Sequence, residues 1–247
     1  SVDVYVADTA TGENVRRLTT TSVDSHFESL QFLASSGSWA PDNRRLALAS
    51  VQKGRGTIVI FDTRNGDVLH NIPMAERGEV FQPAWSPDGN SIAFVAQVGG
   101  FTDLFLHSLA EGSTRRLTTD AFADLQPAWS PDGRELLFIT DRHTSNLDTL
   151  AFGEMAMAVM NVASGQIAPL ATGGTGLTGS PQWSSDGTSI LFVSDRSGRP
   201  DVYRVNRTGG DPVPLTAVPT GVSGITPLSP ALSVARSGGQ TAYSVFR

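Results

Sequence analysis

Four aspartates are the side chains whose type and spacing could do chemistry in this sequence. Asp42, Asp88, Asp132 and Asp186 each follow a tryptophan by three residues, within segments of the Ser-Pro-Asp-Gly kind. A ring of carboxylates could serve acid–base catalysis or bind a cation. Aspartate in such a segment more commonly accepts hydrogen bonds from its own turn. We therefore interpret these four residues as turn residues that recur because a structural unit recurs.

The other reactive side chains form no recognisable catalytic or metal-binding pattern. The sequence has no cysteine, which excludes disulfides and cysteine-ligated zinc. The segment 179–181 lacks the second glycine of a nucleophile elbow, and the glycine-rich segment 173–176 lacks the ending of a phosphate loop. We predict no catalytic residue, no metal site and no cofactor. Four histidines without metal-ligand spacing are His26, His70, His107 and His143.

Composition narrows the fold class and the partners. Of 247 residues, 39% are hydrophobic and 17% are charged, while 25 glycines and 14 prolines favour many short strands joined by tight turns. The formal net charge of −6 argues against nucleic-acid binding, which needs a basic surface. No apolar run is long enough for a membrane-spanning helix. We expect a globular all-β protein that does not bind nucleic acid.

The elements that must position these residues repeat with a period of about 45 residues, which matches the four-stranded blade of a β-propeller. All four tryptophans occupy one position of this repeat, and a degenerate fifth copy runs through residues 230–233. Large rings at that position predict a layer of core between neighbouring blades, although a ligand cage is the alternative. The tryptophans are Trp39, Trp85, Trp129 and Trp183.

Each unit reads as four strands: the tryptophan strand, an apolar strand after the turn, and two further strands of which the last ends in Leu-Thr. Residues 2–8 and 15–19 resemble a third and a fourth strand, whereas residues 230–246 supply only a first and a second. We predict one domain over residues 1–247, with five four-stranded blades closed by pairing of the two terminal half-blades. Part of a six-bladed propeller is the alternative.

The repeat resembles that of the TolB-like β-propeller family. The resemblance rests on Pro-Ala-Trp-Ser-Pro-Asp-Gly within Gln82–Gly89 and its near copy Gln126–Gly133. It implies a non-catalytic protein-binding or scaffolding propeller, periplasmic or otherwise extracytoplasmic, within a bacterial envelope or membrane-associated complex. The alternatives are the propeller domain of a larger hydrolase or peptidase, and a propeller enzyme acting in its central channel.

Partner-binding residues are expected where the loops between blades meet the loops between second and third strands. An insertion at His143–Met157 lengthens one such loop, and rigidly held loops commonly carry function. Arg142 and Arg196 each follow an aspartate, so a local ion pair is the alternative to partner contact. The candidate partner-binding residues are Phe27, Phe81, Phe122, Arg142, His143, Arg196 and Arg199.

Overall fold

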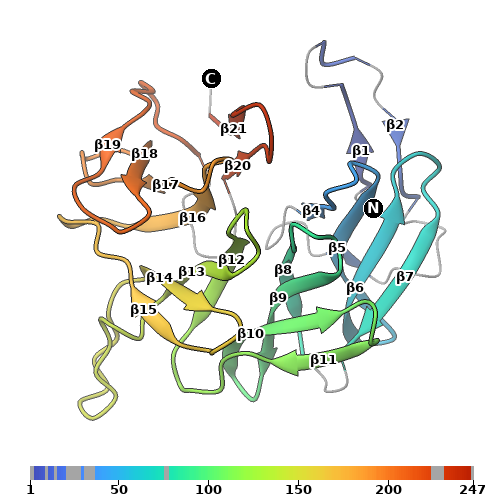
Figure 1. The fold of residues 1–247 in the computed structure, drawn as a ribbon, viewed down its shortest axis with the longest axis horizontal. Coiled ribbons are helices and arrows are strands. Elements are labelled where there is room, and N and C mark those ends of the chain that lie inside the picture. Colours follow the sequence, from blue (N-terminus) through green and yellow to red (C-terminus); the bar gives the residue numbers. More distant parts are fainter. Residues whose placement is uncertain are drawn as a thin grey trace.

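The computed structural model describes residues 3–8, 11–13, 16–20, 29–30, 37–74, 78–223 and 231–245. Every regular element in this part of the chain is a β-strand, so the predicted all-β class is confirmed. The strands form antiparallel sheets that follow one another in chain order around a central axis (Figure 1). This is the blade arrangement that the repeat predicts.

Four sheets correspond to the complete blades, and we number them 1 to 4 along the chain. In each blade the strand that carries the tryptophan is innermost. Blade 1 contains β3 (Ser29–Leu30), β4 (Ser38–Trp39), β5 (Arg45–Gln52), β6 (Arg55–Asp62) and β7 (Val68–Pro73), with β3 and β4 both paired to β5. Blade 2 contains β8 (Val80–Trp85), β9 (Ser91–Val98), β10 (Phe101–Ser108) and β11 (Ser113–Arg116). Blade 3 contains β12 (Asp124–Trp129), β13 (Glu135–Thr140), β14 (Ala156–Asn161) and β15 (Ile167–Pro169). Blade 4 contains β16 (Thr178–Trp183), β17 (Ser189–Ser194), β18 (Asp201–Asn206) and β19 (Val213–Pro214).

The second strand of each blade is buried on both of its faces. Strands β9, β13 and β17 each carry an unbroken apolar run, as expected where neighbouring sheets cover both sides. Phe94, Phe138 and Phe192 occupy the same place in these runs and are fully buried. The core therefore consists of layers between blades.

Neighbouring innermost strands are linked by a repeated hydrogen bond. The backbone N–H of Gln126 donates to Oε1 of Gln82 (2.7 Å), and the backbone N–H of Ser180 donates to Oε1 of Gln126 (2.6 Å). Ser180 Oγ in turn accepts from the backbone N–H of Ala231 (2.8 Å). Each of these three side chains leaves a β-bulge at a residue of positive φ. The bulge directs the side chain out of its own sheet toward the next blade.

The tryptophans reinforce these contacts in three blades and not in the first. Trp129 Nε1 donates to the carbonyl of Ala84 (3.0 Å), and Trp183 Nε1 donates to the carbonyl of Ala128 (3.3 Å). Trp85 is buried, so the predicted packing between blades holds for these three residues. For Trp39 it is wrong, because this side chain is 43% exposed. Strand β4 has only two residues, and no complete blade precedes it in the described part of the chain.

The termini form two separate two-stranded sheets, β1 (Tyr5–Val6) with β2 (Arg16–Arg17), and β20 (Leu232–Val234) with β21 (Thr241–Tyr243). The predicted pairing of the two ends is not found between the described residues 3–8 and 241–245. Residues 244–245 instead pair with 222–223, so this edge is already occupied. The closure that we predicted from the sequence is therefore not confirmed.

The N-terminal strands do repeat the outer half of a blade. The backbone N–H of Val4 donates to Thr19 Oγ1 (2.9 Å), as that of Leu104 does to Thr118 Oγ1 in blade 2 (3.0 Å). The interpretation of these residues as third and fourth strands agrees with this contact.

One arginine links the C-terminal hairpin to the first two blades. Arg236 Nη2 donates to the carbonyls of Trp85 (2.7 Å) and Trp39 (3.4 Å), and Nη1 donates to that of Ser86 (3.5 Å). Burial lowers the pKa of the guanidinium. The hairpin β20–β21 thus contacts blades 1 and 2 through a side chain, without strand pairing.

The two tryptophan environments predict different stabilities. Trp183→Ala removes a buried ring and a hydrogen bond to blade 3, and we expect it to lower the free energy of unfolding by about 3–5 kcal/mol. Trp39→Ala, the matched control at the exposed position, should lower it by less than about 1 kcal/mol. Urea unfolding followed by circular dichroism measures both. Equal losses in the two variants would contradict the assignment of Trp183 to the core between blades.

Candidate partner-binding face

The connections between strands lie on two opposite faces of the propeller, because antiparallel strands alternate in direction. One face, here the turn face, carries the aspartate turns after each innermost strand. The other, here the connection face, carries the links between blades and the turns between second and third strands. In the described chain the connection face includes residues 53–54, 99–100, 117–123, 141–155, 170–177 and 195–200.

The turn aspartates are occupied within their own turns. Asp186 accepts from Ser184 Oγ (2.6 Å) and from the backbone N–H of Thr188 (3.0 Å). Asp88 and Asp132 make the corresponding pairs of hydrogen bonds, and Asp42 accepts from the backbone of Arg44 and Arg45. In this structure the four carboxylates therefore accept hydrogen bonds from their own turns. Within the described residues, no group of three or more His, Asp and Glu side chains could hold a metal ion.

The insertion is the longest of the turns between second and third strands in the four complete blades, and it runs from residue 141 to 155. Its sequence-predicted end at Met157 is two residues too late, because β14 begins at Ala156 and Met157 is a buried residue of that strand. Asn146 and Ala151 exchange two backbone hydrogen bonds (2.8 and 3.0 Å), and Ser145 Oγ accepts from the backbone N–H of Gly153 (2.9 Å). Thr144 Oγ1 donates to the carbonyl of Glu154 (2.6 Å). The loop is thus cross-linked along its length.

Large apolar side chains project from the insertion into solvent. Phe152 is 78% exposed and Leu150 is 72% exposed, and Leu147 is also among the exposed large hydrophobic residues. An ordered loop that presents exposed aromatic and aliphatic groups has the composition of a protein-binding anchor. The sequence analysis located this loop but did not single out these three residues, although their apolar type in a polar insertion was a usable signal.

Arg142 begins the insertion and is occupied by two carboxylates. Its Nη2 contacts both carboxylate oxygens of Asp124 (2.8 and 2.7 Å), and its Nη1 contacts Asp120 Oδ2 (2.7 Å). Burial acts to lower the pKa of this guanidinium, but its hydrogen bonds to Asp124 and Asp120 and their negative charges raise it overall. The expected local pair with Asp141 is absent, since Asp141 accepts from the backbone N–H of Ala123 (2.8 Å). Arg142 therefore braces blade 3.

The remaining candidates fall into different environments. Phe122 lies beside Arg142, with the guanidinium carbon 5.8 Å from its ring centroid. Phe81 is buried in the core between blades, so it is not available to a partner. His143 is exposed, and partial desolvation together with the charge of Arg142 lowers its pKa. Phe27 lies outside the described residues.

The last two arginines lie on blade 4. Arg199 contacts Asp201 at 3.4 Å and is exposed. Arg196 forms no ion pair among the described residues, and its Nη1 donates to the carbonyls of Thr172 (2.9 Å) and Gly173 (3.0 Å). The structure thus brings Phe122, Arg142 and His143 together beside the insertion, and places Arg196 and Arg199 on the neighbouring blade.

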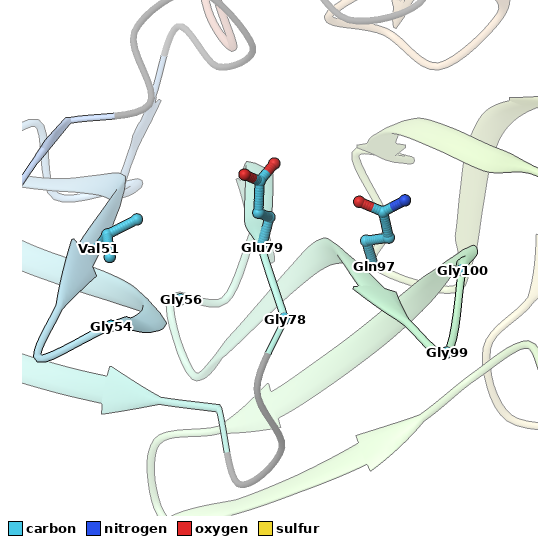
Figure 2. Close-up of a pocket in the computed structure, with 8 residues that line it drawn as sticks. All are labelled: Val51, Gly54, Gly56, Gly78, Glu79, Gln97, Gly99 and Gly100. Atoms are coloured by element: carbon cyan, nitrogen blue, oxygen red, sulfur yellow. The ribbon is translucent and has the colours of Figure 1, made fainter.

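A glycine-lined pocket opens on the same face, between blades 1 and 2. Figure 2 shows the side chains of Glu79, just before β8, and Gln97, in β9, projecting at this pocket. The glycines allow the strands to approach closely, because a Cβ at Gly78 would lie 2.2 Å from the carbonyl oxygen of Gln97. The sequence analysis did not identify this pocket. Its lining residues are Val51, Gly54, Gly56, Gly78, Glu79, Gln97, Gly99 and Gly100.

These features define a β-propeller whose turn face is saturated by its own hydrogen bonds and whose connection face presents side chains to solvent. A family description for the TolB beta propeller domain matches residues 4–147, which is more than half of the chain. The chain therefore belongs to the TolB β-propeller domain family. No helix of the described residues is long and apolar enough to cross a membrane.

Relatives in sequence include Tol-Pal system proteins. The Tol-Pal system protein TolB of Bordetella pertussis is 32% identical over 140 residues, covering 57% of this chain and 30% of that protein. The Tol-Pal system protein TolB of Anaeromyxobacter dehalogenans strain 2CP-C is 32% identical over 90 residues, covering 36% of this chain and 20% of that protein. The chain thus spans about a third or less of the length of these relatives.

Solved structures share the fold. TolB from Acinetobacter baumannii superposes with a TM-score of 0.69 at 23% identity, covering 89% of this chain and 50% of that one. A puromycin-hydrolyzing peptidase from Mycobacterium tuberculosis superposes with a TM-score of 0.59 at 14% identity, covering 90% of this chain and 33% of that one. At these identities the similarity establishes the propeller fold alone.

The occupied turn aspartates predict a defined loss of stability in acid. The hydroxyl of Ser184 and the backbone of Thr188 lower the pKa of Asp186 to about 2, from an ordinary value of 3.8. The ionised carboxylate therefore stabilises the folded chain above about pH 4, and this contribution is lost as the pH falls through about 2. The difference in unfolding free energy between the native protein and Asp186→Asn should be constant near neutrality and shrink below about pH 4. A difference independent of pH in urea titrations would contradict this assignment.

Proposed function

We propose that this chain is a non-catalytic protein-binding propeller that acts in the periplasm as a subunit of a bacterial envelope complex. The observation that carries the proposal is the ordered insertion at residues 141–155, which holds Leu150 and Phe152 in solvent. The relatives that belong to the Tol-Pal system support this setting. Partner binding is accordingly assigned to the connection face.

The proposed interface has the insertion at its centre and the charged residues of blades 3 and 4 around it. Apolar and aromatic anchors within a polar rim are what a protein–protein interface needs. Phe152, Leu150 and Leu147 supply the anchors, and His143 and Arg199 supply part of the rim. Arg142 is occupied by Asp120 and Asp124 and lies beside the ring of Phe122, so it is assigned to holding this part of blade 3 together.

The alternative is a propeller domain within a larger hydrolase or peptidase. The puromycin-hydrolyzing peptidase contains a similar propeller. Under this alternative the chain is the corresponding domain of a larger enzyme. Under either proposal residues 1–247 act as one propeller domain, because the innermost strands of adjacent blades contact one another from β4 through β20. The number of blades in the closed ring stays a prediction.

The interface predicts which substitutions release partners. Phe152→Ala and Leu150→Ala should each reduce recovery of co-purifying envelope proteins about tenfold, since a well-buried interface anchor is worth on the order of 1–2 kcal/mol or more. The measurement is affinity purification of the full-length protein from cross-linked cells, quantified by mass spectrometry.

Leu69→Ala is the matched control, because Leu69 is also an exposed leucine but lies on the outer strand β7. This variant should recover partners at the native level, and circular dichroism should show that all three variants are folded. Native recovery with both loop variants would move the interface away from the insertion.

A further inference from the structure

Blades 3 and 4 contain the same arginine in the same local setting. Arg142 Nε donates to Thr140 Oγ1 (3.3 Å), and Arg196 Nε donates to Ser194 Oγ (3.2 Å). The guanidinium carbon of Arg142 lies 5.9 Å from the ring centroid of Phe138, and that of Arg196 lies 5.1 Å from the ring centroid of Phe192. The preceding aspartates, Asp141 and Asp195, each accept from a backbone N–H of the incoming link. These three contacts are the same in both blades, so the two arginines occupy equivalent sites.

The difference between the sites lies in the carboxylates. In blade 3, Asp124 and Asp120 neutralise Arg142. The corresponding positions of blade 4 are Thr178, the first residue of β16, and Gly174, in the link between blades. Neither residue carries a charge. Blade 4 thus keeps the cation and lacks both of its anions.

Among the described residues, no carboxylate forms an ion pair with Arg196 in place of the two that neutralise Arg142. Nη1 donates to two backbone carbonyls, and no hydrogen bond of Nη2 is found there. Asp195 is directed at the backbone N–H of Leu177 (2.7 Å), and Asp211 lies against Gly173 without forming an ion pair with Arg196. Burial lowers the pKa of Arg196, whereas the carboxylates of blade 3 raise that of Arg142. A partly buried cation without a counter-ion is destabilising, and a bound anion would relieve that cost.

The link leaves room for a larger side chain at residue 174. A Cβ at Gly174 would lie 4.0 Å from Arg196 Nη1, with no other atom within 4 Å beyond its chain neighbours, so the position from which Asp120 reaches Arg142 carries no side chain in blade 4. The planar guanidinium is held by the rings of Phe192 and Tyr203, at 5.1 and 5.2 Å. Its Nη2, which donates to no described residue, can bind a carboxylate as Nη2 of Arg142 binds that of Asp124.

We propose that Arg196, together with the glycine-rich link at residues 173–176, binds the carboxylate of a ligand. In blade 3 the equivalent arginine is neutralised by carboxylates of the chain itself. The ligand is either a small carboxylate or an acidic side chain of a bound protein. The site does not depend on the proposed envelope function, because the comparison between the two blades carries it.

The test follows the two arginines separately by NMR. In ¹⁵N-labelled protein, the Nε–Hε signals of Arg196 and Arg142 are assigned from their loss in Arg196→Lys and Arg142→Lys. Sodium acetate is titrated against sodium chloride at equal ionic strength. A blocked Gly-Glu-Gly peptide is compared with its Gly-Gln-Gly counterpart. We expect acetate and the glutamate peptide to shift the Arg196 signal saturably, while chloride, the glutamine peptide and the Arg142 signal give no saturable shift.

The matched variants are Gly174→Asp and Gly174→Asn. Gly174 has a φ of +74°, a conformation that aspartate and asparagine tolerate about equally. Gly174→Asp should shift the Arg196 signal without ligand and abolish its response to acetate, whereas Gly174→Asn should keep the response. Tenfold tighter binding of the glutamate peptide than of acetate would identify an acidic side chain as the ligand, and similar affinities a small carboxylate. An Arg196 signal that responds equally to acetate and chloride, or equal responses in both Gly174 variants, would overturn the proposal.

Discussion

The hydrogen bond that β12 and β16 each receive from the blade before them is the contact on which this propeller depends. It satisfies a buried backbone N–H at the bulge of the next strand, which would otherwise be left unpaired at a cost of about 1–3 kcal/mol. The residue that provides it, Gln82 or Gln126, adopts a positive φ that is itself unfavourable for a non-glycine residue. The strain is tolerated because only this bulge directs the side chain across the gap between sheets. Tryptophans and phenylalanines then pack at the spacing that this contact sets.

This repeated contact leaves the two faces of the ring with different freedom. The turn face is tied to the repeat, since each aspartate turn is completed by its own hydroxyl and backbone donors. Connections on the opposite face are not constrained in this way. The turn between the second and third strands is short in blade 1, at residues 53–54, and long in blade 3, at residues 141–155. Variable loops on a rigid scaffold are where proteins place recognition. The exposed apolar residues of the insertion lie on this face.

Because the blades have the same backbone arrangement, equivalent positions can be compared from one blade to the next. Trp129 and Trp183 donate to the blade before them, whereas Trp85 Nε1 is buried without a hydrogen-bond partner in the described chain. Its ring is instead covered by Arg45, whose guanidinium carbon lies 4.7 Å from the centroid. Arg142 and Arg196 differ in the same way, because they occupy equivalent positions of the blade but have different neighbouring side chains. Differences of this kind, at equivalent positions, mark where the repeat has been adapted.

The sequence by itself determined the fold class, the repeat, the position of the insertion and the structural role of the turn aspartates. These follow from local chemistry: a proline, an aspartate and a glycine after a tryptophan specify a turn wherever they occur. Contacts between distant segments were decided only by the tertiary structure. It buried Phe81, exposed Trp39, paired residues 244–245 with 222–223, and gave Arg142 two carboxylates that Arg196 lacks. Such outcomes depend on which blades meet in space, and equivalent residues of a repeat acquire different neighbours when the blades beside them differ.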